Sequence, residues 1–246
     1  LIDGNVTRAS LAMAELKEAE TVVEIGPGLG TLTGLLLDAG HRVHAVELDA
    51  RLAGRLKETF AEEAEQGRFS LVEGDAVKLP VGDLPEETAA FHVVANLPYA
   101  ISSPWLEALL STRRLPERMV LMLQKEAADR YLAEHGSKSY GALAIFLSAA
   151  YEAKETRSVS RNCFHPVPAV DSVLLRLDRA PSPFTYSDEV RRLVRNLFTR
   201  RRKQLGALAK AESAENRARV ETWLKKEKLS PTLRPEQVPA VRWRSL

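Results

Sequence analysis

Cysteine is almost absent from this chain of 246 residues, which contains only Cys163. A single thiol excludes a disulfide framework and a zinc site built on cysteines, and it is typical of a protein of the reducing cytoplasm. The five histidines show no spacing of metal ligands, so we expect no metal site. No apolar run approaches the roughly 18 residues that span a bilayer, so we expect no membrane association. These absences predict a cytoplasmic globular protein.

Charge is distributed unevenly along the chain. Apolar residues make up 45% and charged residues 28%, which is enough for a sizeable core, and the net charge is +2. Residues 1–180 carry 19 basic and 26 acidic side chains, whereas residues 181–246 carry 16 basic and 7 acidic ones. A basic C-terminal region on an acidic body indicates a polyanionic partner, although a solvated helical surface would look the same.

The first half of the chain alternates apolar strands with helical stretches, which predicts a parallel sheet covered on both faces. The expected strands are 21–26, 42–48, 69–74, 92–95 and 119–123, and the expected helices are 5–19, 30–39, 50–65, 103–111, 126–134 and 140–149. Two further strands, near 150–159 and 172–178, are too close for a helix between them and predict an antiparallel pair at the sheet edge. Prolines at 181 and 183 indicate a linker. Residues 1–180 and 184–246 are therefore expected to be two domains, the second small and helical.

A glycine-rich loop follows the first strand and opens a helix. Its sequence, Glu24-Ile-Gly-Pro-Gly-Leu-Gly30, places glycines at alternate positions, where the backbone can turn sharply and approach a ligand. This spacing differs from the G-x-G-x-x-G of dinucleotide enzymes, in which a diphosphate lies on the helix N-terminus. It suits a nucleoside ligand without phosphates, such as S-adenosylmethionine. A plain strand-to-helix turn is the alternative.

Acidic residues end the next two strands. Glu47 is placed to accept hydrogen bonds from ribose hydroxyls, and Asp75 to accept one from the exocyclic amine of adenine. Each acid alone would be an ordinary surface residue. The carboxyl ends of neighbouring parallel strands meet in one crevice, so together the three features predict a nucleoside cofactor.

The segment Asn96-Leu-Pro-Tyr99 ends the fourth strand beside that crevice. The Asn96 side-chain oxygen and the Leu97 carbonyl, held outward by Pro98, can accept both hydrogens of an adenine N6 amine and direct its lone pair toward a methyl donor. The face of Tyr99, rather than its hydroxyl, is expected to hold the base. A strand-ending turn would also use Asn and Pro.

Taken together, the motifs resemble those of class I S-adenosylmethionine-dependent methyltransferases, and more closely those of the ribosomal small-subunit RNA adenine dimethyltransferase family. The resemblance is carried by segments 24–33, 46–49, 74–76, 96–99, 124–126, 164–172 and 198–205, in the family's order and spacing. It implies N6-dimethylation of two adjacent adenosines near the 3′ end of 16S rRNA in the small ribosomal subunit. It also implies an α/β fold with a Rossmann-like, mostly parallel seven-stranded sheet, one antiparallel edge strand and a small C-terminal α-helical domain.

The resemblance assigns roles to individual residues. Those implied to contact the cofactor are Leu1, Gly26, Gly28, Gly30, Glu47, Leu48, Asp75, Ala76 and Asn96. Those implied to act on the target base are Asn96, Leu97, Pro98, Tyr99 and Phe164. Leu1 matches the last residue of a family segment that closes over the cofactor. Residues 1–180 then form the catalytic domain and residues 184–246 an RNA-binding domain.

Two regions also have an interpretation independent of the family. Prolines stiffen the loop after Phe164 and can present this ring to a flipped base, although a core phenylalanine is the alternative; His165 is expected on the loop surface. The run Arg200, Arg201, Arg202 and Lys203 can neutralise RNA phosphates, and we expect Arg191, Arg192 and Arg195 to extend it. A solvated charge run is again the alternative.

Three rival functions share part of this pattern. A large-subunit RNA adenine methyltransferase of the antibiotic-resistance type has the same fold and target atom, but usually has Ile at the position of Leu97. A ribosome assembly factor would use the basic C-terminal region without catalysis, which the intact Asn96–Tyr99 segment disfavours. A DNA adenine methyltransferase should carry a larger recognition region. No extended apolar stripe indicates an obligate partner, so we expect a monomer.

Overall fold

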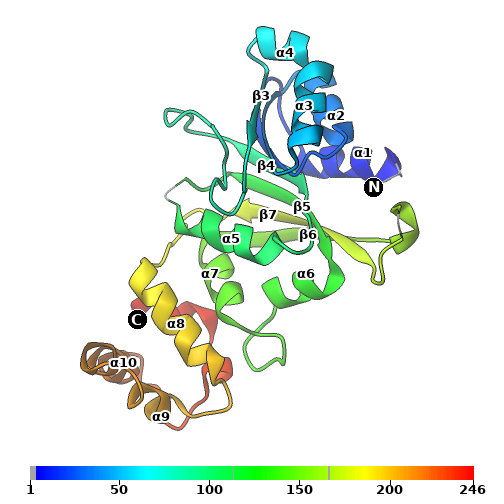
Figure 1. The fold of residues 1–246 in the computed structure, drawn as a ribbon. Coiled ribbons are helices and arrows are strands. Elements are labelled where there is room, and N and C mark those ends of the chain that lie inside the picture. Colours follow the sequence, from blue (N-terminus) through cyan, green and yellow to red (C-terminus); the bar gives the residue numbers. More distant parts are fainter. Residues whose placement is uncertain (1–3, 113, 166) are drawn as a thin grey trace. The chain divides into compact units, whose positions relative to one another are not determined.

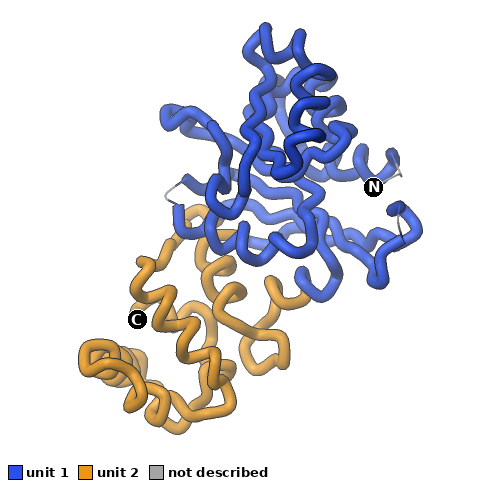
Figure 2. The backbone as a smooth tube through the Cα atoms, in the orientation of Figure 1, with its two compact units in different colours: residues 1–128, 152–179 blue, residues 129–151, 180–246 orange. Residues whose placement is uncertain are grey.

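The computed structural model describes residues 4–112, 114–165 and 167–246 (Figure 1). These form two compact units (Figure 2). Unit 1 comprises residues 1–128 and 152–179, and unit 2 comprises residues 129–151 and 180–246. The second unit thus includes a segment that precedes the expected linker. The catalytic role expected for residues 1–180 and the RNA-binding role expected for residues 184–246 stay predictions.

A seven-stranded sheet with the order β3-β2-β1-β4-β5-β7-β6 dominates unit 1 (Figure 1). Its strands are β1 (Thr21–Ile25), β2 (Arg42–Glu47), β3 (Phe69–Glu73), β4 (His92–Asn96), β5 (Arg118–Gln124), β6 (Tyr151–Val159) and β7 (Ser172–Arg179). The first five strands pair in parallel, and β7 runs antiparallel to β5. The predicted α/β sheet is confirmed, with β7 one place inside the outermost strand, β6.

Both faces of the central strands are buried, as the apolar runs in the sequence require. Val22, Val94 and Val120 lie in one core cluster with side chains of the first three helices. The neighbouring residues Val23 and Val93 point to the opposite face, because side chains alternate along a strand, and both have 0% exposure. The first helices are α1 (Gly4–Ala14), α2 (Thr31–Asp38), α3 (Ala50–Thr59), α4 (Ala61–Glu65) and α5 (Ser102–Ser111).

Two of these helices end earlier than periodicity predicts. Helix α1 stops at Ala14 because Glu15 adopts a positive φ of 45°. The expected helix 50–65 is interrupted at Phe60, whose ring packs edge-on against Phe69 at 5.3 Å. Tertiary packing overrides local helix propensity at Phe60.

Helix α1 is fastened to the sheet by an ion-pair network. Arg176 of β7 pairs with Glu15 directly after α1, with Nη1 2.7 Å from Oε2. Asp178 accepts from Arg176 at 3.0 Å and from Arg118 at 2.9 Å. Burial alone would raise the pKa of Asp178, but the two guanidinium groups hold it below its usual value. The network fixes the C-terminal end of α1, and this helix lines the site described below.

Unit 2 is helical around an aromatic core. Its helices are the end of α6 (Lys125–Tyr131), α7 (Ala142–Ala150), α8 (Asp188–Thr199), α9 (Leu205–Ala209) and α10 (Ala214–Lys226), with short 3₁₀ helices at Pro235–Gln237 and Ala240–Ser245. Trp223 stacks on Trp243 at 4.7 Å, and Phe198 lies 5.7 Å from Trp243. The Tyr140 hydroxyl donates to the Val238 carbonyl at 3.0 Å, which ties the two chain segments of this unit together.

Candidate functional site

A cavity of about 250 Å³ opens at the carboxyl ends of β1 and β4, where the sequence predicts a cofactor. We call it the glycine-loop cavity. It is lined by Thr7, Ser10, Glu24, Gly26, Pro27, Gly28, Leu29, Thr31, Leu32, Asn96 and Met122. The strand ends, the glycine-rich loop and helix α1 therefore meet in one place, as parallel sheets favour.

Glycine is required at two positions of the loop for different reasons. Gly28 has φ 60°, and a Cβ built there would meet nothing within 4 Å, so the backbone faces open space. Gly30 has φ 82°, and a Cβ there would lie 2.7 Å from Leu56 and 2.8 Å from Phe60. Gly30 therefore allows α2 and α3 to pack closely, whereas Gly28 leaves room for a ligand against the backbone.

Glu47 ends β2 beside this loop and Asp75 follows β3, and neither acid is among the residues that line the glycine-loop cavity. Glu47 is only 8% exposed, and its two carboxylate oxygens accept from the Gly28 amide at 3.1 Å and the Asp49 amide at 2.9 Å. Asp75 accepts from the Val77 amide at 2.9 Å with one oxygen. A carboxylate oxygen has a second lone pair, so both acids keep acceptor capacity for a ligand. Leu48 is 70% exposed beside Glu47, while Ala76 is buried at 5%.

Glu24 is a site residue that the sequence reasoning did not single out. It lines the cavity at 2% exposure and accepts from the Thr33 hydroxyl at 2.7 Å. The pKa of its carboxyl is raised to about 8, mainly by burial; the Thr33 hydrogen bond lowers it and the nearby charge of Glu47 raises it. A charged residue inside the apolar run Thr21–Ile25 was the available signal, because buried carboxyls are rare without a partner.

Helix α1 also contributes polar groups that were not predicted. Thr7 and Ser10 are buried, at 3% and 5% exposure, and line the glycine-loop cavity. Sequence comparison with the family pointed to the N-terminal segment only through Leu1, which lies outside the described residues. The ion-pair network at Glu15 holds this helix in position.

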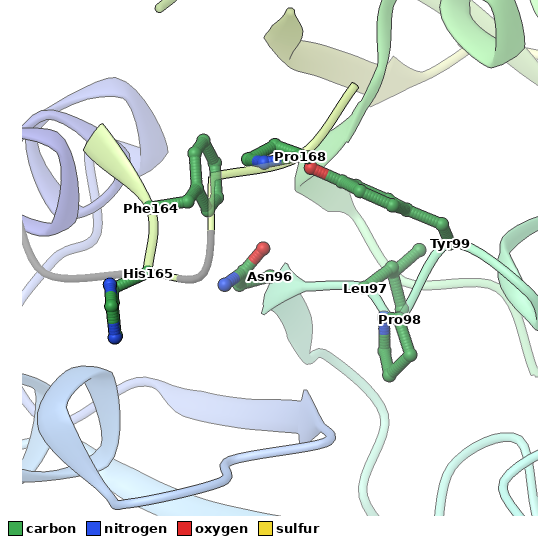
Figure 3. Close-up of a pocket in the computed structure, with 7 residues that line it drawn as sticks. All are labelled: Asn96, Leu97, Pro98, Tyr99, Phe164, His165 and Pro168. Atoms are coloured by element: carbon green, nitrogen blue, oxygen red, sulfur yellow. The ribbon is translucent and has the colours of Figure 1, made fainter. Parts of the chain in front are cut away.

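A second cavity, of about 280 Å³, lies on the other side of Asn96 (Figure 3). We call it the Tyr99 cavity. It is lined by Asn96, Leu97, Pro98, Tyr99, Phe164, His165 and Pro168. Figure 3 shows Asn96 between Phe164 and His165 on one side and Leu97, Pro98 and Tyr99 on the other. Asn96 belongs to both cavities, and it is the one residue of the described chain that their linings share.

The two aromatic walls of the Tyr99 cavity are anchored differently. Phe164 is 8% exposed and belongs to the hydrophobic core, so it is a core residue that also borders the cavity. The Tyr99 hydroxyl forms a hydrogen bond of 2.8 Å with the Ser172 hydroxyl. His165 is exposed as expected, yet it lines the cavity, as does Pro168, which was not predicted.

The basic run after α8 divides into anchored and free side chains. Arg201 donates to the carbonyls of Ser137, Lys138 and Tyr140 at 3.3, 2.7 and 3.4 Å, so its guanidinium holds a loop of unit 2. Arg200, Arg202 and Lys203 are exposed, and no acidic side chain within the described residues pairs with them. They remain candidates for phosphate contact.

The expected extension of this basic region along α8 is wrong for Arg191. Arg191 is 2% exposed and lies over the Phe146 ring at 4.9 Å, and Arg195 approaches the same ring at 5.9 Å. The Arg191 guanidinium therefore packs against an aromatic side chain in the interior of unit 2, whereas Arg195 is half-buried. Arg192 is exposed and can still contribute to the surface.

Across residues 4–112, 114–165 and 167–246, no helix combines the length and the apolar character needed to cross a membrane. The same residues contain no group of three or more His, Cys, Asp or Glu side chains that could hold a metal ion.

Known proteins resemble this chain over its full length. A family model described as Ribosomal RNA adenine dimethylase matches residues 1–238. Ribosomal RNA small subunit methyltransferase A of Opitutus terrae is 49% identical over 247 residues, covering 100% of this chain and 88% of that protein. A dimethyladenosine transferase structure from Plasmodium falciparum has a TM-score of 0.77 at 29% identity and covers 100% of this chain and 94% of that one. The 23S rRNA methyltransferase ErmE has a TM-score of 0.64 at 27% identity, with coverage of 98% and 96%.

Proposed function

Because the chain belongs to the ribosomal RNA adenine dimethylase family, we propose that it transfers methyl groups from S-adenosylmethionine to two adjacent adenosines near the 3′ end of 16S rRNA. Family membership confirms the prediction made from the motifs, and it makes the chain an rRNA methyltransferase. The N6 atom of each adenosine would receive two methyl groups. The small ribosomal subunit or its precursor is the proposed substrate, and a cytoplasmic monomer the proposed form.

One observation carries the proposal: Asn96 forms part of both cavities. A methyl transfer requires donor and acceptor to meet in line at one point, so the catalytic group belongs where their sites join. The glycine-loop cavity supports cofactor binding and the Tyr99 cavity supports base binding. Asn96 alone among the described residues borders both.

The residues of the glycine-loop cavity fit S-adenosylmethionine. The open space at Gly28 admits a ligand against the backbone, and the buried Glu24 carboxyl suits the cationic end of the cofactor. Beyond the lining of this cavity, Glu47 and Asp75 would accept from the ribose hydroxyls and the adenine amine, with Leu48 and Ala76 beside the ring. When bound, the cofactor supplies a methyl group on a sulfonium, so the reaction depends on positioning more than on a strong base.

The Tyr99 cavity would hold the flipped adenine between aromatic walls. Tyr99 and Phe164 supply ring surfaces, and base stacking on such surfaces is worth roughly 1–3 kcal/mol. The Asn96 side-chain oxygen and the Leu97 carbonyl would accept the two N6 hydrogens, which favours a nitrogen whose lone pair points toward the glycine-loop cavity. Pro98 restricts the backbone that presents this carbonyl.

Methylation of purified ribosomal particles tests the proposal. The protein, S-adenosylmethionine and small subunits lacking these methyl groups are expected to yield N6-dimethyladenosine, whereas large subunits and naked 16S rRNA are expected to yield little. Methylation of large subunits instead would match the function of the structural neighbour ErmE. Binding to small subunits without methyl transfer would match an assembly factor. Either result would refute the proposed activity.

A further inference from the structure

The hydrogen bond between the Tyr99 and Ser172 hydroxyls joins the segment after β4 to the first residue of β7, which is distant in sequence. The oxygens lie 2.8 Å apart, and Ser172 has 0% exposure. Ser172 begins β7 and pairs with Gln124 at the end of β5. Because buried hydroxyls without a partner are costly, this contact fixes the far end of the Tyr99 ring.

The near end of Tyr99 is fixed as well. Its carbonyl accepts from the Ser102 hydroxyl at 3.2 Å, and the Ile101 amide donates to the Pro98 carbonyl at 3.1 Å. The backbone turn and the hydroxyl contact therefore hold the ring at both ends. Loss of the contact to Ser172 would remove the hydrogen bond that restrains the ring against rotation about χ1.

The opposite wall of the cavity depends on the residue next to Ser172. The Asp171 carboxylate accepts from the Arg161 amide at 2.9 Å, and the Arg161 carbonyl accepts from the Phe164 amide at 3.2 Å. The Asp171 carbonyl also accepts from the Lys125 amide at 3.1 Å, which ties the pair to the end of β5. Two consecutive residues thus hold both aromatic walls: Asp171 acts through the Phe164 turn and Ser172 through Tyr99.

We propose that Ser172 is a positioning residue that sets the width of the Tyr99 cavity and thereby supports the second methyl transfer. The inference rests on the proposed function. After the first transfer, N6 carries one hydrogen and one methyl group, so only one acceptor still engages it. The remaining orientation must come from the walls, and a loosened wall therefore slows the second transfer more than the first.

Single-turnover kinetics on small subunits, with mass analysis of mono- and dimethyladenosine, test this role. Ser172→Ala is expected to slow the second transfer relative to the first by roughly three- to tenfold, the range for one lost neutral hydrogen bond. Tyr99→Phe removes the other hydroxyl without altering the buried position, so it should give the same ratio. The double variant should be no worse than either single variant, and Ser172→Thr, which keeps a hydroxyl, should lie closer to the parent.

The results distinguish a failure of the Ser172 role from a failure of the proposed function. If the parent dimethylates small subunits and both Ser172→Ala and Tyr99→Phe keep the parent's ratio of the two transfer rates, the role of Ser172 is overturned but the proposed function is not. Additive effects in the double variant overturn it too, as does an equal slowing of both transfers, because a merely structural role would produce that. A parent that leaves small subunits unmethylated overturns the proposed function and this inference with it.

Discussion

Ionisation of Glu24 should make the stability of the free protein depend on pH in a direction opposite to that of most carboxylates. Its pKa is raised from 4.5 to about 8 by burial. Between these values the folded protein keeps a proton that the unfolded chain has released. The free energy of unfolding therefore falls as pH rises through this window, by up to about 1.4 kcal/mol per pH unit. Below pH 4.5 both states are protonated and the stabilisation is fully present, and above about pH 8 both are ionised and the fall is complete.

Glu24→Gln isolates this contribution, because glutamine resembles the protonated carboxyl and does not titrate. At pH 4 the variant should be nearly as stable as the parent, and at pH 6 it should already be about 2 kcal/mol more stable, because the unfolded chain releases its proton above pH 4.5. From pH 6 to pH 8 it should gain roughly 2 kcal/mol relative to the parent, which is the linkage integral for a pKa near 8. Histidines titrate in the same range, so the difference between the two proteins is the quantity to compare.

Urea unfolding followed by circular dichroism at pH 6, 7 and 8 measures this difference. Thr33→Val is the matched control, because it removes the hydroxyl that bonds to Glu24 at 2.7 Å but keeps the titrating carboxyl. This control should retain the pH dependence of the parent or steepen it. Parallel stability curves for the parent and Glu24→Gln would refute the reasoning.

Three further predictions concern the proposed activity. Asn96→Ala should slow methyl transfer by about a hundredfold or more, the scale of one lost preorganised polar contact, with a smaller loss of cofactor affinity; an unchanged single-turnover rate on saturated subunits would contradict it. Glu47→Ala should weaken S-adenosylmethionine binding by roughly 1.5–3 kcal/mol in calorimetry, and binding equal to that of the parent would remove the assignment. Joint replacement by Ala of the exposed cations Arg200, Arg202 and Lys203 should flatten the salt dependence of subunit binding, by close to one slope unit per lost phosphate contact. Arg201→Ala should instead mainly lower Tm, and the reverse pattern would indicate that Arg201 contacts the RNA.

The parts of the fold that depend on local pattern could be predicted from sequence. Apolar runs flanked by glycine or acidic residues located the parallel strands, and the strand ends located Glu47, Asp75 and Asn96. Parallel topology brings these ends to the same edge of the sheet, although Asn96 lines the glycine-loop cavity and Glu47 and Asp75 do not. The glycine-rich loop was informative for the same reason: its backbone requirements are local.

The parts that depend on distant partners could not be predicted. Arg191 reads as a surface cation on an amphipathic helix, yet its partner Phe146 is on another helix. Arg201 belongs to a run of four basic residues, and only the fold shows that it binds carbonyls of the loop before α7. No sequence pattern around Ser172 predicts its hydrogen bond with Tyr99. Glu24 differs, since an acid within an apolar strand was a visible signal.

The discontinuous path of the chain through its two units has a consequence for the order of synthesis. Helix α7 is almost wholly buried, with Ile145 at 0% and Phe146 at 1% exposure, and it packs against α8 and the last 3₁₀ helix. A ribosome makes α7 long before Tyr186, which packs on Phe146, and longer still before Arg244, which donates to the Ala149 carbonyl. The nascent chain therefore carries an uncovered apolar helix while its partners are still untranslated. Ending the chain near residue 180 would make that exposure permanent, so a shortened protein should aggregate rather than yield an isolated folded domain.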